Sequence, residues 1–142
     1  MRSNVLLLGL LAGSPSSHAE DAGADGAAAS RAGMTCEVVS VPPGGFDARE
    51  IYLEYAGTAC GGEMCMVYQL DGDPRSSCMP ADCAGPAEID ARMFCTCRCS
   101  GTDPGAEYCD CPADMTCVPN VVSTGGADLM GGYCVRSAIA GG

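Results

Sequence analysis

The chain has no lysine and no tryptophan, and its one histidine is His18. Serine–histidine catalysis needs a histidine and Schiff-base chemistry needs a lysine. His18 lies in a stretch with the features of a cleavable leader, so the mature chain is expected to contain neither residue type. These absences predict a protein that is not an enzyme, with no catalytic residue and no bound cofactor.

The first residues predict a secretory signal peptide over 1–19. Arg2 gives a basic start, an apolar run occupies 5–12, and Ser17 and Ala19 are the small residues of a cleavage site. The apolar run is too short to span a bilayer, which needs about 18 apolar residues or more. We therefore expect an exported protein, extracellular or periplasmic, without a membrane span.

Basic residues and large apolar residues are both scarce. Seven arginines stand against 18 Asp and Glu residues, which gives a net charge of −11. Phosphate backbones and anionic lipid surfaces are bound through Lys and Arg, so no nucleic-acid partner is expected. Only three Ile, three Leu, eight Val and two Phe follow Ala19. Without cross-links, so small an apolar share in an acidic chain indicates disorder.

Cysteine is abundant, in contrast. The chain has 12 cysteines, an even number, and all lie beyond the predicted leader. Secreted domains with small cores are commonly cross-linked, and a bridge closing a loop of ~15 residues contributes about 3 kcal/mol. We predict structural disulfides, with the pairing left open, at Cys36, Cys60, Cys65, Cys78, Cys83, Cys95, Cys97, Cys99, Cys109, Cys111, Cys117 and Cys134.

A thiolate metal site is the alternative interpretation of these cysteines. The run Cys95-Thr-Cys97-Arg-Cys99 brings three thiols together, and soft thiolates bind Zn²⁺ or Cu⁺. The four-residue gaps in Cys60–Cys65 and Cys78–Cys83 also fit zinc ligand spacing. An oxidising compartment favours disulfides instead, so no metal ligand is expected. The absence of Cys-x-x-Cys argues against thioredoxin-type redox exchange.

The cysteine positions favour one domain. Five cysteines precede the stretch 84–94 and seven follow it. Both numbers are odd, so at least one bridge must join the two groups if all pair within the chain. We expect a single disulfide-stapled domain over 35–136, after a flexible Ala/Gly/Asp-rich linker over 20–34 and before a flexible tail over 137–142.

The predicted fold class is small, disulfide-rich and mostly β, with long loops and at most one short helix over about 86–93. Pro86 suits the first helical position and Glu88 the first turn. Alternation along a strand would place Cys95, Cys97 and Cys99 on one face, from which they can reach three partners. β-branched and aromatic stretches predict strands over 35–41, 51–55, 64–70, 93–99, 107–111, 115–122 and 131–139.

Three hairpin pairs are expected among these strands: 35–41 with 51–55, 93–99 with 107–111, and 115–122 with 131–139. The acidic turn Asp71-Gly-Asp73 offers oxygen atoms that Ca²⁺ prefers, but it lacks the later ligands of an EF-hand loop. A plain turn is therefore the favoured interpretation. No pair among the eighteen acids stands out as a general acid and base.

Several motifs together resemble a known group of proteins. They are Gly72-Asp-Pro-Arg75, Phe94-Cys-Thr-Cys-Arg-Cys99, Cys109-Asp-Cys-Pro112, Thr116-Cys-Val118 and Gly132-Tyr-Cys-Val135. Over roughly 60–136 the chain resembles uncharacterised cysteine-rich exported proteins of myxobacteria. Cys109 to Cys117 is also weakly similar to an EGF-like module, with Ala113-Asp-Met115 where a Gly-aromatic pair is usual. The resemblance implies an exported bacterial protein and no particular activity.

The sequence therefore predicts a non-enzymatic exported protein with a structural or binding role. A protein or an extracellular matrix component is the expected kind of partner. Contacts with it are expected at the loops 71–75 and 101–105. The alternatives are a thiolate metal-binding protein, or a small inhibitor that presents a rigid loop to a secreted hydrolase.

Overall fold

The structure, a computed structural model, describes residues 30–141 of the chain. The predicted signal peptide and most of the predicted linker lie outside the described residues. The fold class is confirmed, because the described chain is mostly β with one short helix and six disulfides. The elements are β1 (Ile51–Tyr55), β2 (Met64–Tyr68), α1 (Pro86–Arg92), β3 (Met93–Thr96), β4 (Arg98–Ser100), β5 (Met115–Val122) and β6 (Gly131–Arg136).

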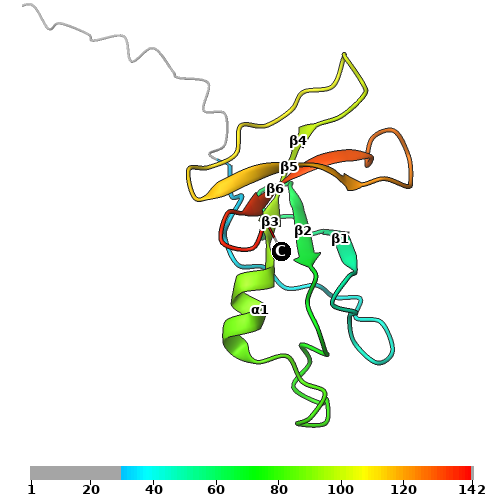
Figure 1. Ribbon diagram of the computed structural model, residues 1–142, viewed down its shortest axis with the longest axis vertical. Coiled ribbons are helices and arrows are strands. Elements are labelled where there is room, and N and C mark those ends of the chain that lie inside the picture. Colours follow the sequence, from blue (N-terminus) through cyan, green and yellow to red (C-terminus); the bar gives the residue numbers. More distant parts are fainter. Residues whose placement is uncertain (1–29, 142) are drawn as a thin grey trace, which may run out of the picture.

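The strands form two antiparallel three-stranded sheets. The first sheet has the order β1-β2-β3, with Leu53 opposite Met66 and Met66 opposite Phe94. The second has the order β4-β6-β5, with Cys117 opposite Cys134. Figure 1 shows β5 and β6 lying across the direction of β2 and β3, with α1 beyond the opposite end of β3.

One extended stretch, 93–100, belongs to both sheets. It runs through β3, passes Cys97 and continues as β4 in the second sheet. The carbonyl of Cys97 accepts a hydrogen bond of 3.1 Å from the amide of Cys134 on β6. This stretch covers the predicted strand 93–99, and the change of sheet at Cys97 gives the two sheets their crossed arrangement.

The helix α1 confirms the sequence prediction and is one residue shorter. Pro86 stands at its start, where a missing backbone N–H costs nothing, and Glu88 lies in the first turn. It ends at Arg92 because Met93 already has the extended backbone of β3. No residue of α1 is fully buried, and only Ile89 packs on the core.

Two apolar clusters fill the interior. The first lies between the first sheet and the N-terminal segment and contains Phe46, Val67, Leu70 and Met93 with four half-cystines. The second lies between the two sheets and contains Met66, Phe94, Tyr133 and Val135. Half-cystines, methionines and tyrosines thus supply much of the volume that aliphatic side chains usually fill.

Two predicted strands are absent from the described chain. In 35–41 only Thr35 pairs with the sheet, against Phe94 on β3, so the expected hairpin with 51–55 is wrong and β1 pairs with β2. The segment 107–111 makes one backbone hydrogen bond to β4, from Cys109 N to Arg98 O, and no ladder. Both segments are therefore held to the domain by disulfides, and not by the sheet hydrogen bonds that the prediction assumed.

Four predicted boundaries also differ from the structure. The strand expected over 64–70 ends at Tyr68, because Gln69 has a positive φ of 53°. Residues 33–34, predicted as linker, exchange two backbone hydrogen bonds with Cys95. Residues 137–141, predicted as a flexible tail, form a turn whose Ile139 packs on the second cluster. The predicted hairpin of 115–122 with 131–139 is present, with β6 ending at Arg136.

Among residues 30–141, no helix has the length and apolar character needed to cross a membrane.

Candidate functional site

The twelve cysteines form six disulfides, as the sequence predicted, and none is free. Five bridges close loops of 12 to 35 residues, while Cys78–Cys83 closes one of 5. The full set, called here the disulfide frame, is Cys36–Cys65, Cys60–Cys95, Cys78–Cys83, Cys97–Cys109, Cys99–Cys117 and Cys111–Cys134.

The predicted bridge between the cysteines before 84–94 and those after it is present. It is Cys60–Cys95, and no other bridge joins the two groups. Cys95, Cys97 and Cys99 do reach three different partners. They do not share one core, because Cys95 lies in the first cluster while Cys97 and Cys99 pack on the second. The change of sheet at Cys97 breaks the simple alternation that the prediction assumed.

Three bridges of the second sheet are stacked on one another. The Sγ atom of Cys134 lies 3.8 Å from that of Cys97 and 3.7 Å from that of Cys109. The Sγ atom of its bridge partner Cys111 lies within 4.8 Å of those of Cys99 and Cys117. Cys111–Cys134 therefore lies between the other two bridges, and the six sulfur atoms form one packed layer.

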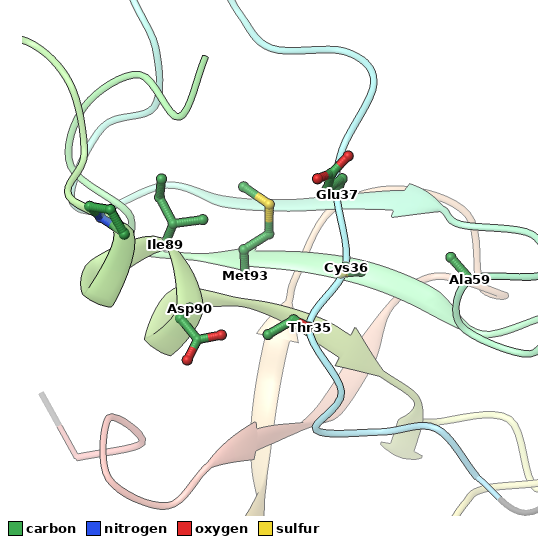
Figure 2. A pocket seen from close by; sticks show the side chains of 8 residues that line it. Thr35, Cys36, Glu37, Ala59, Ile89, Asp90 and Met93 are labelled. Carbon is green, nitrogen blue, oxygen red and sulfur yellow. The ribbon is translucent and has the colours of Figure 1, made fainter. Parts of the chain in front are cut away.

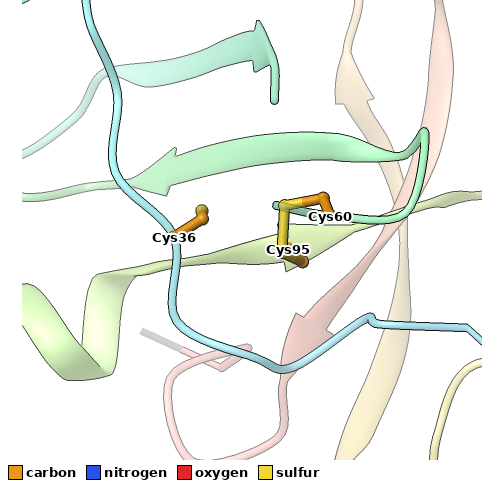
Figure 3. A group of neighbouring side chains, drawn as sticks. All are labelled: Cys36, Cys60 and Cys95. Carbon is orange, nitrogen blue, oxygen red and sulfur yellow. A yellow bond between two sulfur atoms is a disulfide. The ribbon is translucent and has the colours of Figure 1, made fainter. Parts of the chain in front are cut away.

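Close sulfur atoms raise the question of a metal centre. Three groups of three cysteines have sulfur atoms within 4.8 Å of one another, and Figure 3 shows the group of Cys36, Cys60 and Cys95. Every one of these sulfur atoms already belongs to a disulfide. A metal ligand must be a free thiolate, so the geometry favours cross-links over the thiolate metal-binding alternative.

The N-terminal segment crosses one face of the first sheet. Residues 35–41, called here the strap, begin beside β3, where Thr35 pairs with Phe94. Cys36 is then bridged to Cys65 on the middle strand β2. Farther along, the amides of Val39 and Ser40 donate to the carboxylate of Glu54 on β1, at 2.8 and 3.0 Å. These contacts fix the strap over the sheet and hold the pKa of Glu54 below its usual range.

A groove of about 590 Å³ lies between the strap and α1. Figure 2 shows Ile89 and Asp90 on α1, Thr35 and Glu37 on the strap, and Met93 between the two elements. Its remaining lining residues are Cys36, Ala59 and Pro86. A second depression of about 440 Å³ shares Cys36, Glu37, Ile89 and Met93 with it, so the two are continuous along the strap.

The loop 71–75, one of the two predicted contact loops, is built into the domain. The carboxylate of Asp73 is buried and accepts from Arg75 Nε at 2.8 Å, which together with the Arg75 amide holds the pKa of Asp73 below its usual range. The amides of Gly72 and Asp73 bond to Phe46 and Asp82. Asp73 oxygens engaged by a guanidinium are poor ligands for Ca²⁺, in agreement with a plain turn.

The other predicted contact loop, 101–105, is exposed at the far side of the second sheet (Figure 1). The hydroxyl of Tyr108 donates to the carbonyl of Asp103 at 2.7 Å, and the guanidinium of Arg98 lies 5.2 Å from the Tyr108 ring centre. The loop has a defined shape but does not line the groove. The groove residues Glu37, Ile89, Asp90 and Met93 were missed, because only folding brings positions so far apart together.

Comparisons with protein-family models, curated proteins and solved structures find no match to this chain.

Proposed function

We propose that this is an exported, non-enzymatic bacterial protein that binds a protein partner in the groove between the strap and α1. The observation that carries the proposal is that a disulfide, Cys36–Cys65, fixes one wall of this groove. The opposite wall, α1, runs directly into β3. A site whose walls are fixed before binding loses little conformational entropy when a ligand arrives.

Further support comes from the lining of the groove. It is concave, falls in the usual size range of ligand sites and combines apolar side chains with two carboxylates. The lining contains no free thiol, and no hydrogen bond within residues 30–141 joins the Thr35 hydroxyl to Glu37 or Asp90. A hydroxyl nucleophile is normally activated by such a bond to a base. A binding role therefore fits this lining better than catalysis.

Export is part of the same proposal. Six disulfides indicate formation in an oxidising compartment, outside the cytoplasm. The signal-peptide pattern over 1–19 and the resemblance to exported myxobacterial proteins point the same way. The protein would then mature at Glu20 and act in the periplasm or beyond the cell.

A photo-crosslinking experiment in the exporting cell tests the binding role. A photoreactive residue replaces Thr35, which is exposed and lines the groove, or Thr102, which is exposed on the far loop. We expect one discrete protein adduct from position 35 and none of the same mass from position 102. The same adduct from both positions, or none from position 35, would overturn the assignment of the groove.

The mass of the exported protein tests the proposed export, the cleavage before Glu20 and the six disulfides. Six bridges lower the native mass by about 12 Da relative to the fully reduced chain, since each removes two hydrogens. A chain that starts at Glu20 and shows this difference supports export with cleavage. Twelve thiols that react without a reductant would contradict it.

A further inference from the structure

We propose that the partner enters the groove with an apolar segment that carries a lysine or arginine side chain. The inference rests on the proposed binding function and adds the chemistry of the ligand. It follows from three features of residues 30–141: an apolar floor, two carboxylates without partners beside it, and a chain whose own cations are already engaged.

The floor of the groove is apolar. Met93 is 3% exposed and forms the base, while Ile89 is half-buried and packs on the first cluster. Along the strap the second depression adds Val38 and Val41, which are also partly buried. Aliphatic side chains of a partner would remove this surface from water, which is favourable by the hydrophobic effect.

Two carboxylates line the same groove, Glu37 from the strap and Asp90 from α1. Both residues are exposed, and neither carboxylate has a hydrogen bond or ion pair within residues 30–141. Other acids of the described chain have such bonds, as Glu54 does with the strap and Glu88 with Arg92. Glu37 and Asp90 are thus available to a cation that comes from outside.

The protein's own arginines do not supply that cation. Arg136, near Asp90, donates to the backbone carbonyls of Asp90 and Gly33, at 2.7 and 2.8 Å, and its guanidinium lies 5.2 Å from the Phe94 ring centre. Arg31, at the Ala59 end, donates to the carbonyls of Thr58 and Ala59. Arg75, which lines the second depression, is paired with Asp73.

The arginines elsewhere in the described chain are engaged as well. Each of its arginines donates to a carboxylate or a backbone carbonyl within residues 30–141, namely Arg31, Arg49, Arg75, Arg92, Arg98 and Arg136. Among the acidic residues of the described chain, only Asp47, Asp73 and Glu88 form ion pairs with these arginines. The remaining negative charge repels acidic ligands and attracts cationic ones, so the field of the protein agrees with the groove.

A titration followed by amide NMR shifts tests the ligand chemistry. The probes are two hexapeptides with a Leu-Ala-Leu-Ala centre, one with an arginine at each end and the other with a glutamate at each end. We expect the arginine peptide at low ionic strength to move the amide signals of 35–38 and 87–93. The glutamate peptide should leave them in place.

Matched double variants separate the groove from the general charge of the protein. Glu37→Gln with Asp90→Asn removes two negative charges from the groove. Glu107→Gln with Asp110→Asn removes the same charges and residue types from exposed positions after β4, where neither carboxylate has a partner in the described chain. We expect about fivefold weaker binding of the arginine peptide to the first variant and less than twofold for the second, as two exposed ion pairs would give.

Three outcomes would overturn the inference in distinguishable ways. Equal weakening in both variants, or shifts spread over the acidic surface, would mean that the arginine peptide senses only net charge. Equal binding of both peptides in the groove would leave a binding site that selects apolar side chains without regard to charge. Binding of neither peptide, with a position-35 adduct in the cell, would keep the proposed function and reject this ligand chemistry.

Discussion

The hydroxyl of Thr96 donates a hydrogen bond of 2.6 Å to the backbone carbonyl of Cys134, and both residues are fully buried. Thr96 is the last residue of β3, and Cys134 lies in the middle of β6. The bond therefore ties the first sheet to the central strand of the second. It lies next to the point at which the chain changes sheets, where Cys97 accepts from the amide of Cys134.

Thr96→Val should destabilise the protein by about 1–3 kcal/mol, because it removes the donor from a buried carbonyl while keeping the shape of the side chain. Thr96→Ser, which keeps the hydroxyl and loses a methyl group, should cost about 1 kcal/mol. Urea unfolding of the oxidised proteins measures both. A valine variant as stable as the wild type would show that the bond does not hold the sheets together.

Two bridges should contribute very differently to stability. Cys60–Cys95 spans 35 residues and is fully buried, whereas Cys78–Cys83 spans only 5. The entropy of loop closure predicts a loss of about 4 kcal/mol when the first pair is changed to alanine and about 2 kcal/mol for the second. Equal urea midpoints for the two double variants would contradict this order.

Exposure also predicts the order in which the bridges are reduced. Cys117 is exposed and Cys78 and Cys83 are half-buried, whereas Cys60 and Cys95 are both 0% exposed. A small reductant should therefore open Cys99–Cys117 and Cys78–Cys83 first and Cys60–Cys95 last. Brief treatment with a phosphine, alkylation at acid pH and peptide mass mapping give the order directly. Early alkylation of Cys60 would contradict it.

The stacked bridges of the second sheet should exchange partners after the first of them is reduced. Once Cys99–Cys117 is open at neutral pH, a thiolate lies within 4.8 Å of the sulfur of Cys111. Attack on Cys111 would form a new bridge and release Cys134 as a thiolate, which is ordinary thiol–disulfide exchange. We expect a Cys99–Cys111 or Cys111–Cys117 bridge after slow alkylation at neutral pH, and none after rapid quenching in acid.

Composition and local pattern were enough to predict much of this fold. The strand 51–55, the helix beginning at Pro86 and the last hairpin all have residues whose propensities agree with their final state. The even number of cysteines beyond a leader pattern predicted that they form disulfides, but it left the pairing open. The odd division of cysteines around 84–94 predicted a crossing bridge, which is Cys60–Cys95.

The groove could not be predicted in the same way. Thr35 to Val41 has strand composition, yet Cys36 is bridged to the middle strand, so the segment crosses the sheet instead of extending it. Its partner α1 begins some fifty residues later, and no local signal links Glu37 to Asp90. The strand predicted over 107–111 was wrong for a related reason. Disulfides to Cys97 and Cys134 hold this segment in place, so it needs no ladder of backbone hydrogen bonds.

The turn before β1 offers a test of close backbone packing. Gly44 and Gly45 both have positive φ, 90° and 86°, but a Cβ on Gly45 would lie 2.6 Å from the carbonyl carbon of Gly72, whereas a Cβ on Gly44 meets nothing within 4 Å. Gly45→Ala should therefore cost clearly more than the roughly 1 kcal/mol of backbone strain expected for Gly44→Ala. Thermal unfolding of the two variants measures the difference, and equal melting temperatures would show that the turn can shift away from Gly72.

The strap should loosen in acid. The amides of Val39 and Ser40 hold the pKa of Glu54 below its usual range, and Arg75 does the same for Asp73. Carboxyls with a lowered pKa in the folded state stabilise it fully above their unfolded values of about 4. That stability is lost as the pH falls through the lower folded values, because the unfolded chain then binds more protons. The urea midpoint should be flat from pH 7 to 5 and fall below pH 4.

Glu54→Gln isolates the contribution of the strap to this acid sensitivity. The amide cannot titrate and can accept through only one oxygen, so the variant should be less stable at pH 7 and lose less of its stability between pH 5 and 2.5. Glu107→Gln, at an exposed carboxylate without a partner in the described chain, should keep the wild-type profile. If both variants kept the wild-type acid slope, Glu54 would not fix the strap. Because the strap is one wall of the groove, binding of the arginine peptide to wild type should weaken over the same acid range.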